Sequence, residues 1–303
     1  MKNNVLLTAS DRRYGDFLIE HWFRSLRENS DLGNIDVAVM DYGLSLAQHY
    51  YLEKHGIITR KGKRDGHVAV IRYREMRDFL TETAYNQVAL CDSGDIIFQG
   101  DISPVFQQDT SSYRAVCEDY KPFFSVFISS DFFDPADRQR LSECFIHNRM
   151  VNGGFIVAPR DRMIHLADEC LSTIRDMTRF GPDQIVLNGV LYEEGFVELE
   201  KTYNYVIATA KEGVSVESGV VKTANGRMPL VVHNAGNLGL LRPIEDFGYG
   251  PERNKLKEDT LNALKTLYQS TEGFFKTQEL FIESRRRFRT RLRKMIRNLR
   301  LID

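Results

Sequence analysis

The sequence predicts an α/β fold in which a mostly parallel central sheet is flanked by helices and followed by a basic amphipathic helical extension. From residue 4 to residue 91, short apolar runs alternate with segments of helical periodicity. Residues 88–91 are apolar or small at every position, which is typical of a strand covered on both faces. The last 20 residues are strongly basic and have an apolar stripe at helical spacing, which predicts the extension.

The first part of the chain alternates strands and helices in order. Apolar runs predict strands at residues 4–9, 35–40, 56–59 and 87–91, and helical spacing predicts helices over 17–26, 45–55 and 70–83. A series of this kind forms right-handed crossovers and therefore a largely parallel sheet.

The second part is less regular. We expect a short strand at 96–98, a strand at 151–158, a helix over 160–179, a helix that begins at Asp183, and late strands at 196–209 and 229–233. No internal repeat or low-complexity linker divides the chain. We therefore expect one catalytic domain, residues 1–248, and a C-terminal helical extension, residues 249–303.

Targeting and membrane-spanning segments are not predicted. The first 13 residues contain one short apolar run, which is too short for a secretory signal, and no stretch approaches the ~18–20 apolar residues of a membrane span. These observations favour a cytoplasmic protein.

Four short segments place polar residues beside glycine where an apolar run begins or ends. They are residues 92–95, 152–154, 181–184 and 233–236. Glycine lets a ligand approach the backbone, and in α/β sheets ligands bind at the carboxyl ends of strands. Asp92 and Asp95 could bond the local backbone in a β-turn, or their oxygens could hold Mg²⁺ or Mn²⁺ shared with substrate phosphates. His233 follows another apolar run and could complete such a site.

The order of these segments resembles the GT-A nucleotide-sugar glycosyltransferases, most closely the retaining galactosyl- and glucosyltransferases of family 8. The matching stretches are Ala9-Ser10-Asp11, Tyr73-Arg74, CDSGDIIFQGDISPVF at 91–106, Asn152-Gly153-Gly154, Asp183-Gln184 with Asn188, and His233 with Gly236. The resemblance covers about residues 4–240. It implies a Rossmann-like GT-A fold and the transfer of a hexose from a UDP-sugar, with retention of configuration, to a glycan or lipid-linked saccharide. Related enzymes act in lipopolysaccharide and polysaccharide biosynthesis.

The resemblance also implies roles for individual residues. Asp92, Asp95 and His233 would hold Mn²⁺ or Mg²⁺, although the aspartates are three residues apart where the family has two, so that Asp92 or Ser93 could take the first position. The implied donor-binding residues are Ala9, Asp11, Tyr14, Arg74, Asn152, Gly153, Gly154 and Gly236. The implied catalytic residues are Asp183, which would accept hydrogen bonds from sugar hydroxyls, and Gln184 beneath the anomeric carbon. Because a neutral amide is a weak nucleophile, retention would arise by front-face attack.

Two other functions remain open. A catalytically inactive nucleotide-sugar-binding or scaffold protein would explain the altered aspartate spacing and the absence of the lysine that the family usually has after His233. A sugar-phosphate nucleotidyltransferase is less favoured, because residues 8–12 contain no glycine for a triphosphate loop.

The tail carries a second signal. Residues 284–303 contain nine Arg or Lys and one Asp, a net of +8, which leaves −9 for the rest of a chain whose total is −1. Phe281, Phe288, Leu292, Met295, Leu299 and Ile302 form the apolar stripe. A basic amphipathic helix of this kind binds anionic membranes, which predicts peripheral attachment through residues 281–302 to the inner face of the membrane. The alternatives are a helix packed on the body and RNA binding, and we expect no nucleic-acid partner.

Overall fold

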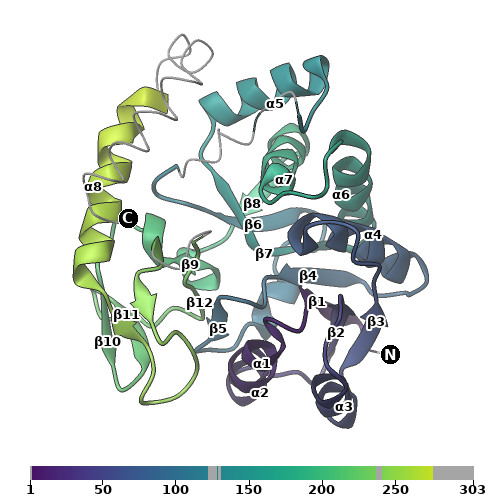
Figure 1. Cartoon of the computed structure of the whole chain (residues 1–303), viewed down its shortest axis with the longest axis horizontal. Coiled ribbons are helices and arrows are strands. Elements are labelled where there is room, and N and C mark those ends of the chain that lie inside the picture. Colours follow the sequence, from purple (N-terminus) through teal and green to yellow (C-terminus); the bar gives the residue numbers. More distant parts are fainter. Residues whose placement is uncertain (1, 122–127, 129–130, 237–240, 276–303) are drawn as a thin grey trace.

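A seven-stranded sheet forms the centre of the molecule (Figure 1). The computed structural model describes residues 2–121, 128, 131–236 and 241–275. The strand order is β3-β2-β1-β4-β7-β6-β8. The strands are β1 (Asn4–Ser10), β2 (Ile35–Asp41), β3 (Ile58–Lys61), β4 (Gln87–Cys91), β6 (Tyr113–Cys117), β7 (Val151–Pro159) and β8 (Phe196–Glu198). This arrangement confirms the predicted α/β fold.

Most strand pairs of this sheet are parallel. Strands β3, β2, β1 and β4 run parallel to one another, and β6 is parallel to β8, whereas β7 is antiparallel to both β4 and β6. The parallel part coincides with the regular strand–helix alternation of the first 91 residues, where crossover helices connect successive strands.

Helices cover both faces of the sheet (Figure 1). One face packs against α4 (Val68–Thr81), α5 (Pro135–His147), α6 (Arg160–Thr173) and α7 (Pro182–Glu194). The other packs against α1 (Gly15–Phe17), η1 (Leu18–Phe23), α2 (Arg24–Asn29) and α3 (Leu46–Lys54). In β4, Val88 and Leu90 enter the first core, and Ala89 and Cys91 enter the second. The strand is thus covered on both faces, as its composition predicts.

Smaller sheets complete the molecule. β5 (Ile96–Phe98), β12 (Val231–His233) and β9 (Tyr205–Val206) form a three-stranded sheet in that order. Two ribbons pair β10 (Val214–Glu217) with β11 (Val220–Thr223), and β13 (Ile244–Glu245) with β14 (Lys255–Leu256). In the register of β5 and β12, His233 lies opposite Ile96 and therefore beside Asp95.

Two predicted elements are too long. Helix α6 ends at Thr173 rather than at 179, because Ile174 turns to an extended conformation and the backbone N–H of Arg175 bonds to Phe132. The strand expected over 196–209 is reduced to β8 and β9, because the single turns η4 (Lys201–Tyr203) and η5 (Ile207–Thr209) interrupt it. A further turn, η2 (Ser103–Gln107), follows β5.

The first part of the C-terminal segment packs on the body. β13, which precedes the expected boundary at residue 248, pairs with β14, which follows it. Helix α8 (Glu258–Phe275) buries Leu261, Leu264 and Leu267. The division at residues 248 and 249 stays a prediction, and the basic stretch 281–302 lies outside the described residues. Among the helices that the structure describes, none combines the length and the apolar composition needed to cross a bilayer.

Candidate functional site

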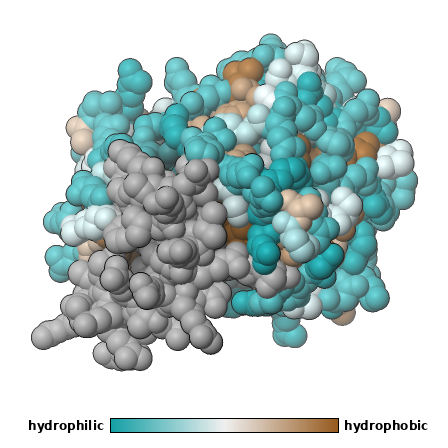
Figure 2. Space-filling view, turned by 90° about the horizontal axis from the view of Figure 1, so that it is seen from above, coloured by the Kyte–Doolittle hydropathy of each residue, from teal (hydrophilic) through white to brown (hydrophobic). Residues whose placement is uncertain are grey.

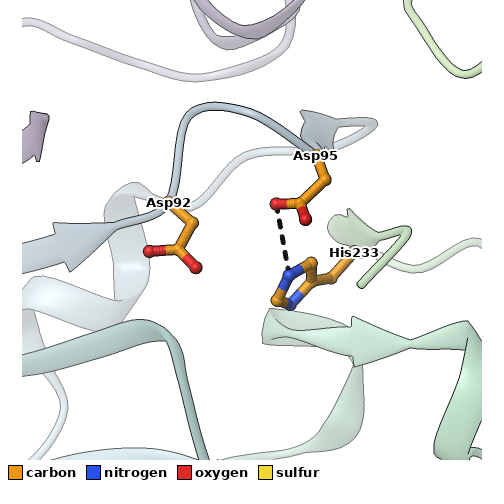
Figure 3. Close-up of side chains that lie close together, drawn as sticks. All are labelled: Asp92, Asp95 and His233. Carbon is orange, nitrogen blue, oxygen red and sulfur yellow. Dashed lines mark ion pairs between the residues drawn. The ribbon is translucent and has the colours of Figure 1, made fainter. Parts of the chain in front are cut away.

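Two carboxylates and an imidazole meet at the carboxyl end of the central sheet. Asp92 follows β4 directly, Asp95 precedes β5, and His233 ends β12. Figure 3 shows the aspartates on either side of the β4–β5 loop with the His233 ring below Asp95. One ligand atom from each residue lies within 4.8 Å of the others, and His233 Nε2 is 3.4 Å from Asp95 Oδ1. These distances bring together the three residues for which a metal role was expected.

Hydrogen bonds of the loop decide which residue faces His233. Ser93 Oγ donates to the carbonyl of Ala9 at 2.9 Å, so this hydroxyl is held against β1. The backbone of Asp92 is fixed at both ends, because its N–H donates to Gly154 and its carbonyl accepts from Trp22 Nε1 at 2.9 Å. Of the two residues left open for the first position, Asp92 supplies the carboxylate in the cluster.

The charges of the cluster depend on one another. Burial alone would raise the pKa of Asp95, but the charges of His233 and Arg242 hold this pKa below its usual value. Burial alone would lower the pKa of His233, but the Asp95 carboxylate raises it. Arg242 Nη2 lies 3.0 Å from Asp95 Oδ2 and so places a second cation at the cluster, in the region where the sequence lacks a lysine.

Arg72 connects the cluster to Asp183. Its guanidinium pairs with the Asp92 carboxylate and lies 3.9 Å from Asp183 Oδ2, and its side chain is 7% exposed. Arg74, the arginine expected at the site, turns to Asp65, to Glu75 and to the carbonyl of Lys63.

Arg72 was not among the residues expected at the site, although its position in the sequence gives a signal. Arg72 lies four residues before Met76 and seven before Phe79, on the face of α4 that is buried. Arg74 lies two residues further along, which is about 200° around the helix. Helical spacing alone could therefore have placed Arg72 toward the sheet.

Asp183 is buried, and one of its carboxylate oxygens is unpaired within the part of the chain that the structure describes. It lies in the first turn of α7, and Gly181, the residue before this helix, has a positive φ of 111°. Among the described residues, Asp183 Oδ1 has no hydrogen-bond partner. Burial raises the pKa of Asp183 to about 6, against the opposing charge of Arg72. A buried, unpaired carboxylate oxygen is unfavourable unless a ligand hydroxyl or N–H bonds to it.

Gln184 is held against β7. Its Oε1 accepts from the N–H of Gly153 at 3.0 Å, and its Nε2 donates to the carbonyl of Val151. A Cβ at position 153 would lie 2.9 Å from Gln184 Oε1. Gly153 thus allows the close approach of α7 to β7 that fixes the Gln184 amide.

The expected donor-binding residues of the first loop lie next to the turn that carries the aspartates. Asp11 Oδ1 accepts from the N–H groups of Arg13 and Tyr14, and its Oδ2 lies 2.8 Å from Arg64 Nη2. The Tyr14 ring lies against Gly94, where a Cβ would be 3.0 Å from Tyr14 Cδ1. This loop, which begins beyond Ala9, is therefore in contact with the turn that carries both aspartates.

Gly154 lies against the His233 ring, Asn152 bonds to Gly154, and Gly236 bonds to Arg242. A Cβ at position 154 would lie 2.4 Å from His233 Cε1, so glycine leaves the space that the ring occupies. The Asn152 side chain bonds to Glu118 and to the N–H of Gly154. The carbonyl of Gly236 accepts from Arg242 Nε at 3.1 Å. In this structure Asn152 and Gly154 support the histidine ring.

No protein-family model matches the chain, and no curated protein matches its sequence. Its structure is similar to those of several glycosyltransferases. The galactosyltransferase LgtC, in complex with donor and acceptor sugar analogues, is 14% identical with a TM-score of 0.51, and the match covers 88% of this chain and 95% of LgtC. GlyE from Streptococcus pneumoniae TIGR4 is 18% identical with a TM-score of 0.50, over 89% of this chain and 64% of GlyE. The bifunctional glycosyltransferase WbbM is 15% identical with a TM-score of 0.51, over 79% of this chain and 47% of WbbM.

These matches show a shared fold. The chain spans less than two thirds of GlyE and less than half of WbbM, but nearly all of LgtC. The mostly parallel sheet with helices on both faces is the fold of these glycosyltransferases, as the resemblance to family 8 implied.

Proposed function

We propose that this protein is a metal-dependent glycosyltransferase that moves a hexose from a UDP-sugar to a glycan or lipid-linked acceptor. The observation that carries the proposal is the meeting of Asp92, Asp95 and His233 at the carboxyl end of a sheet with a glycosyltransferase fold. Arg72 links this cluster to Asp183 Oδ2, and Asp183 Oδ1 has no partner among the described residues. In α/β proteins this edge is where ligands bind.

The donor set fits a divalent ion. Carboxylate oxygens suit Mg²⁺ and Mn²⁺, and an imidazole nitrogen beside them favours Mn²⁺. Asp92, Asp95 and His233 would hold this ion, and the bound ion would stabilise the negative charge that develops on the nucleoside diphosphate as it leaves. Arg242 would move from Asp95 to a phosphate, because its partner carboxylate would then bind the ion.

The sugar would lie over β7 and the start of α7. Asp183 Oδ1 would accept a hydrogen bond from a sugar hydroxyl, which would satisfy the buried oxygen. Arg72 would keep Asp92 and Asp183 in fixed positions. Asp11 and Tyr14, in the loop that contacts the turn of residues 92–95, would contact the nucleoside.

Retention of configuration would follow from the state of Gln184. Both ends of its amide already bond to β7, and an amide is a weak nucleophile, so a covalent intermediate on this residue is not favoured. Front-face attack would instead transfer the acceptor proton to the departing phosphate oxygen.

Release of UDP tests the proposal. The purified protein would be incubated with a panel of UDP-sugars in Mn²⁺ and in EDTA. We expect Mn²⁺-dependent hydrolysis or transfer of one donor, and a loss of at least about 100-fold in Asp95→Ala, because that variant removes a ligand of the ion. Asp101→Ala is the control, because the Asp101 carboxylate accepts hydrogen bonds from the backbone N–H groups of Ser103 and Asp31 and is not part of the cluster.

The alternative functions predict other outcomes. An inactive nucleotide-sugar-binding protein would bind UDP in Mn²⁺ and would turn over no donor. Equal activity of wild type and Asp95→Ala, or equal activity in EDTA, would contradict the proposed role of the cluster.

A further inference from the structure

A chain of buried polar side chains lies behind His233. It runs from Glu118, at the end of β6, through Asn152 on β7 and Asn204 before β9 to the histidine. The exposed fractions are 6% for Glu118, 7% for Asn152, 1% for Asn204 and 3% for His233. Buried polar groups must be paired, so each orientation in the chain restricts the next.

A backbone N–H fixes the first amide. Gly154 N–H donates to Asn152 Oδ1 at 2.8 Å, and a backbone N–H can only donate, so this atom of Asn152 must be the oxygen. The Asn152 NH₂ group then faces Glu118 Oε1 at 2.8 Å. Asn204 approaches the same oxygen of Asn152 at 2.8 Å and must do so with its own NH₂ group.

The orientation of Asn204 determines the state of the imidazole. With its NH₂ group on Asn152, Asn204 presents Oδ1 to His233 Nδ1 at 3.1 Å. An amide oxygen accepts only, so Nδ1 carries the proton. The neutral ring then has its lone pair on Nε2, the atom that faces Asp95.

We propose that Asn204 is a positioning residue that sets the tautomer of His233 and so prepares Nε2 to bind the divalent ion. This inference rests on the proposed function, in which Asp92, Asp95 and His233 hold that ion. A histidine ligand needs a lone pair on the binding nitrogen, and a partner on its other nitrogen fixes both the tautomer and the ring direction. Pairing of β9 with β12, which places Val206 opposite His233, brings Asn204 into position.

The test uses two readouts on the full chain. Two-bond ¹H–¹⁵N spectra of the metal-free protein, recorded while the pH is raised until the ring is neutral, report the tautomer, and His233→Gln identifies the His233 signals. Titration with Mn²⁺ followed by electron paramagnetic resonance reports the affinity of the site for the ion alone.

Three variants separate positioning from packing. Asn204→Leu removes the acceptor and keeps a branched side chain. Asn204→Asp keeps an acceptor for Nδ1–H, although it replaces the NH₂ group on Asn152 by an oxygen. Asn254→Ala is the control, because Asn254 is equally buried, at 2% exposed, and bonds to the backbone of Gly248 and Gly219.

We expect the Nδ1–H tautomer in wild type, Asn204→Asp and Asn254→Ala, and a shift toward Nε2–H in Asn204→Leu. The Mn²⁺ affinity of Asn204→Leu should fall by about 10- to 100-fold, as for other residues behind a metal ligand. Asn204→Asp should bind Mn²⁺ at least about tenfold more tightly than Asn204→Leu.

An Nε2–H tautomer in wild type would overturn the proposal, and so would an unchanged tautomer and affinity in Asn204→Leu. If Asn204→Leu does not fold, the tautomer of the wild type and the tautomer of Asn204→Asp test the proposal. Failure of wild type to bind Mn²⁺ would overturn the proposed function. The tautomer of the metal-free protein would still test whether Asn204 sets the state of His233.

Discussion

At the scale of single residues, Asp183 combines burial with an unpaired oxygen. Its surroundings raise its pKa to about 6, above the ~3.9 of an aspartate in an unfolded chain. The folded protein therefore binds the proton more tightly than the unfolded chain does. The stability from this group is fully present below about pH 4 and is lost as the pH rises through about 6. At neutral pH the charged Asp183 destabilises the fold.

We therefore predict that Asp183→Asn is inactive but more stable than wild type at pH 7.5. The neutral amide does not carry the unfavourable buried charge, so the gain should be on the order of 2 kcal/mol at pH 7.5 and should vanish near pH 4. Calorimetric melting temperatures at both pH values measure the difference. A variant less stable than wild type at pH 7.5 would show that the carboxylate is already well compensated in the free protein.

Single residues also show what the sequence could and could not predict. Asp92, Asp95 and His233 each follow or precede an apolar run, which made a shared site possible, and the resemblance to family 8 favoured it. Arg72 was missed because the choice within Tyr73-Arg74 depended on a resemblance and not on the helical face. Asn204 gave no sequence signal, because an isolated asparagine in a loop is common.

At the scale of elements, the pairing of the strands was harder to predict than their positions in the sequence. The apolar runs of β5 and β12 were both expected, but nothing in either run specifies that the two pair antiparallel across 135 positions of the chain, from Ile97 to Val232. β7 is buried on both faces, and its sequence therefore lacks the polar alternation of a half-exposed strand, as is typical of parallel strands. It is nevertheless antiparallel to β4 and β6. Strand direction depends on the connections, and the irregular segment before β7 does not show it.

Two glycines at the site allow neighbouring elements to pack closely. Gly153 allows α7 to approach β7, and Gly154 allows the His233 ring of β12 to approach β7. The sequence reading assigned both to the approach of a ligand. In the structure each contacts a site side chain of another element, which explains why the glycine pair lies within a strand, where glycine is otherwise unfavourable.

At the scale of the whole molecule, charge is divided unequally along the chain. The described residues on the face in Figure 2 are mostly hydrophilic, with hydrophobic side chains in small separate groups. The predicted membrane contact lies in residues 281–302, outside the described residues, after a helix α8 that is anchored by Leu261, Leu264 and Leu267.

We therefore predict that removal of residues 276–303 separates membrane binding from catalysis. Full-length protein should sediment with vesicles that contain anionic lipid and should be released by salt, because each cation of the tail contributes ~1 kcal/mol at an anionic surface. The truncated protein should stay in the supernatant and should keep Mn²⁺-dependent UDP release. Equal sedimentation of both proteins, or binding of the full chain to neutral vesicles, would argue against the tail as a membrane anchor.

The most direct test of the central claim is calorimetric titration of UDP into wild type and Asp95→Asn, in Mn²⁺ and in EDTA. If the cluster holds the ion that binds the diphosphate, ion and nucleotide must strengthen each other's binding. Wild type should bind UDP at least about tenfold more tightly in Mn²⁺ than in EDTA, and Asp95→Asn should lose this difference. UDP binding of equal strength in all four titrations would show that the nucleotide site does not depend on Asp92, Asp95 and His233, and would contradict the account.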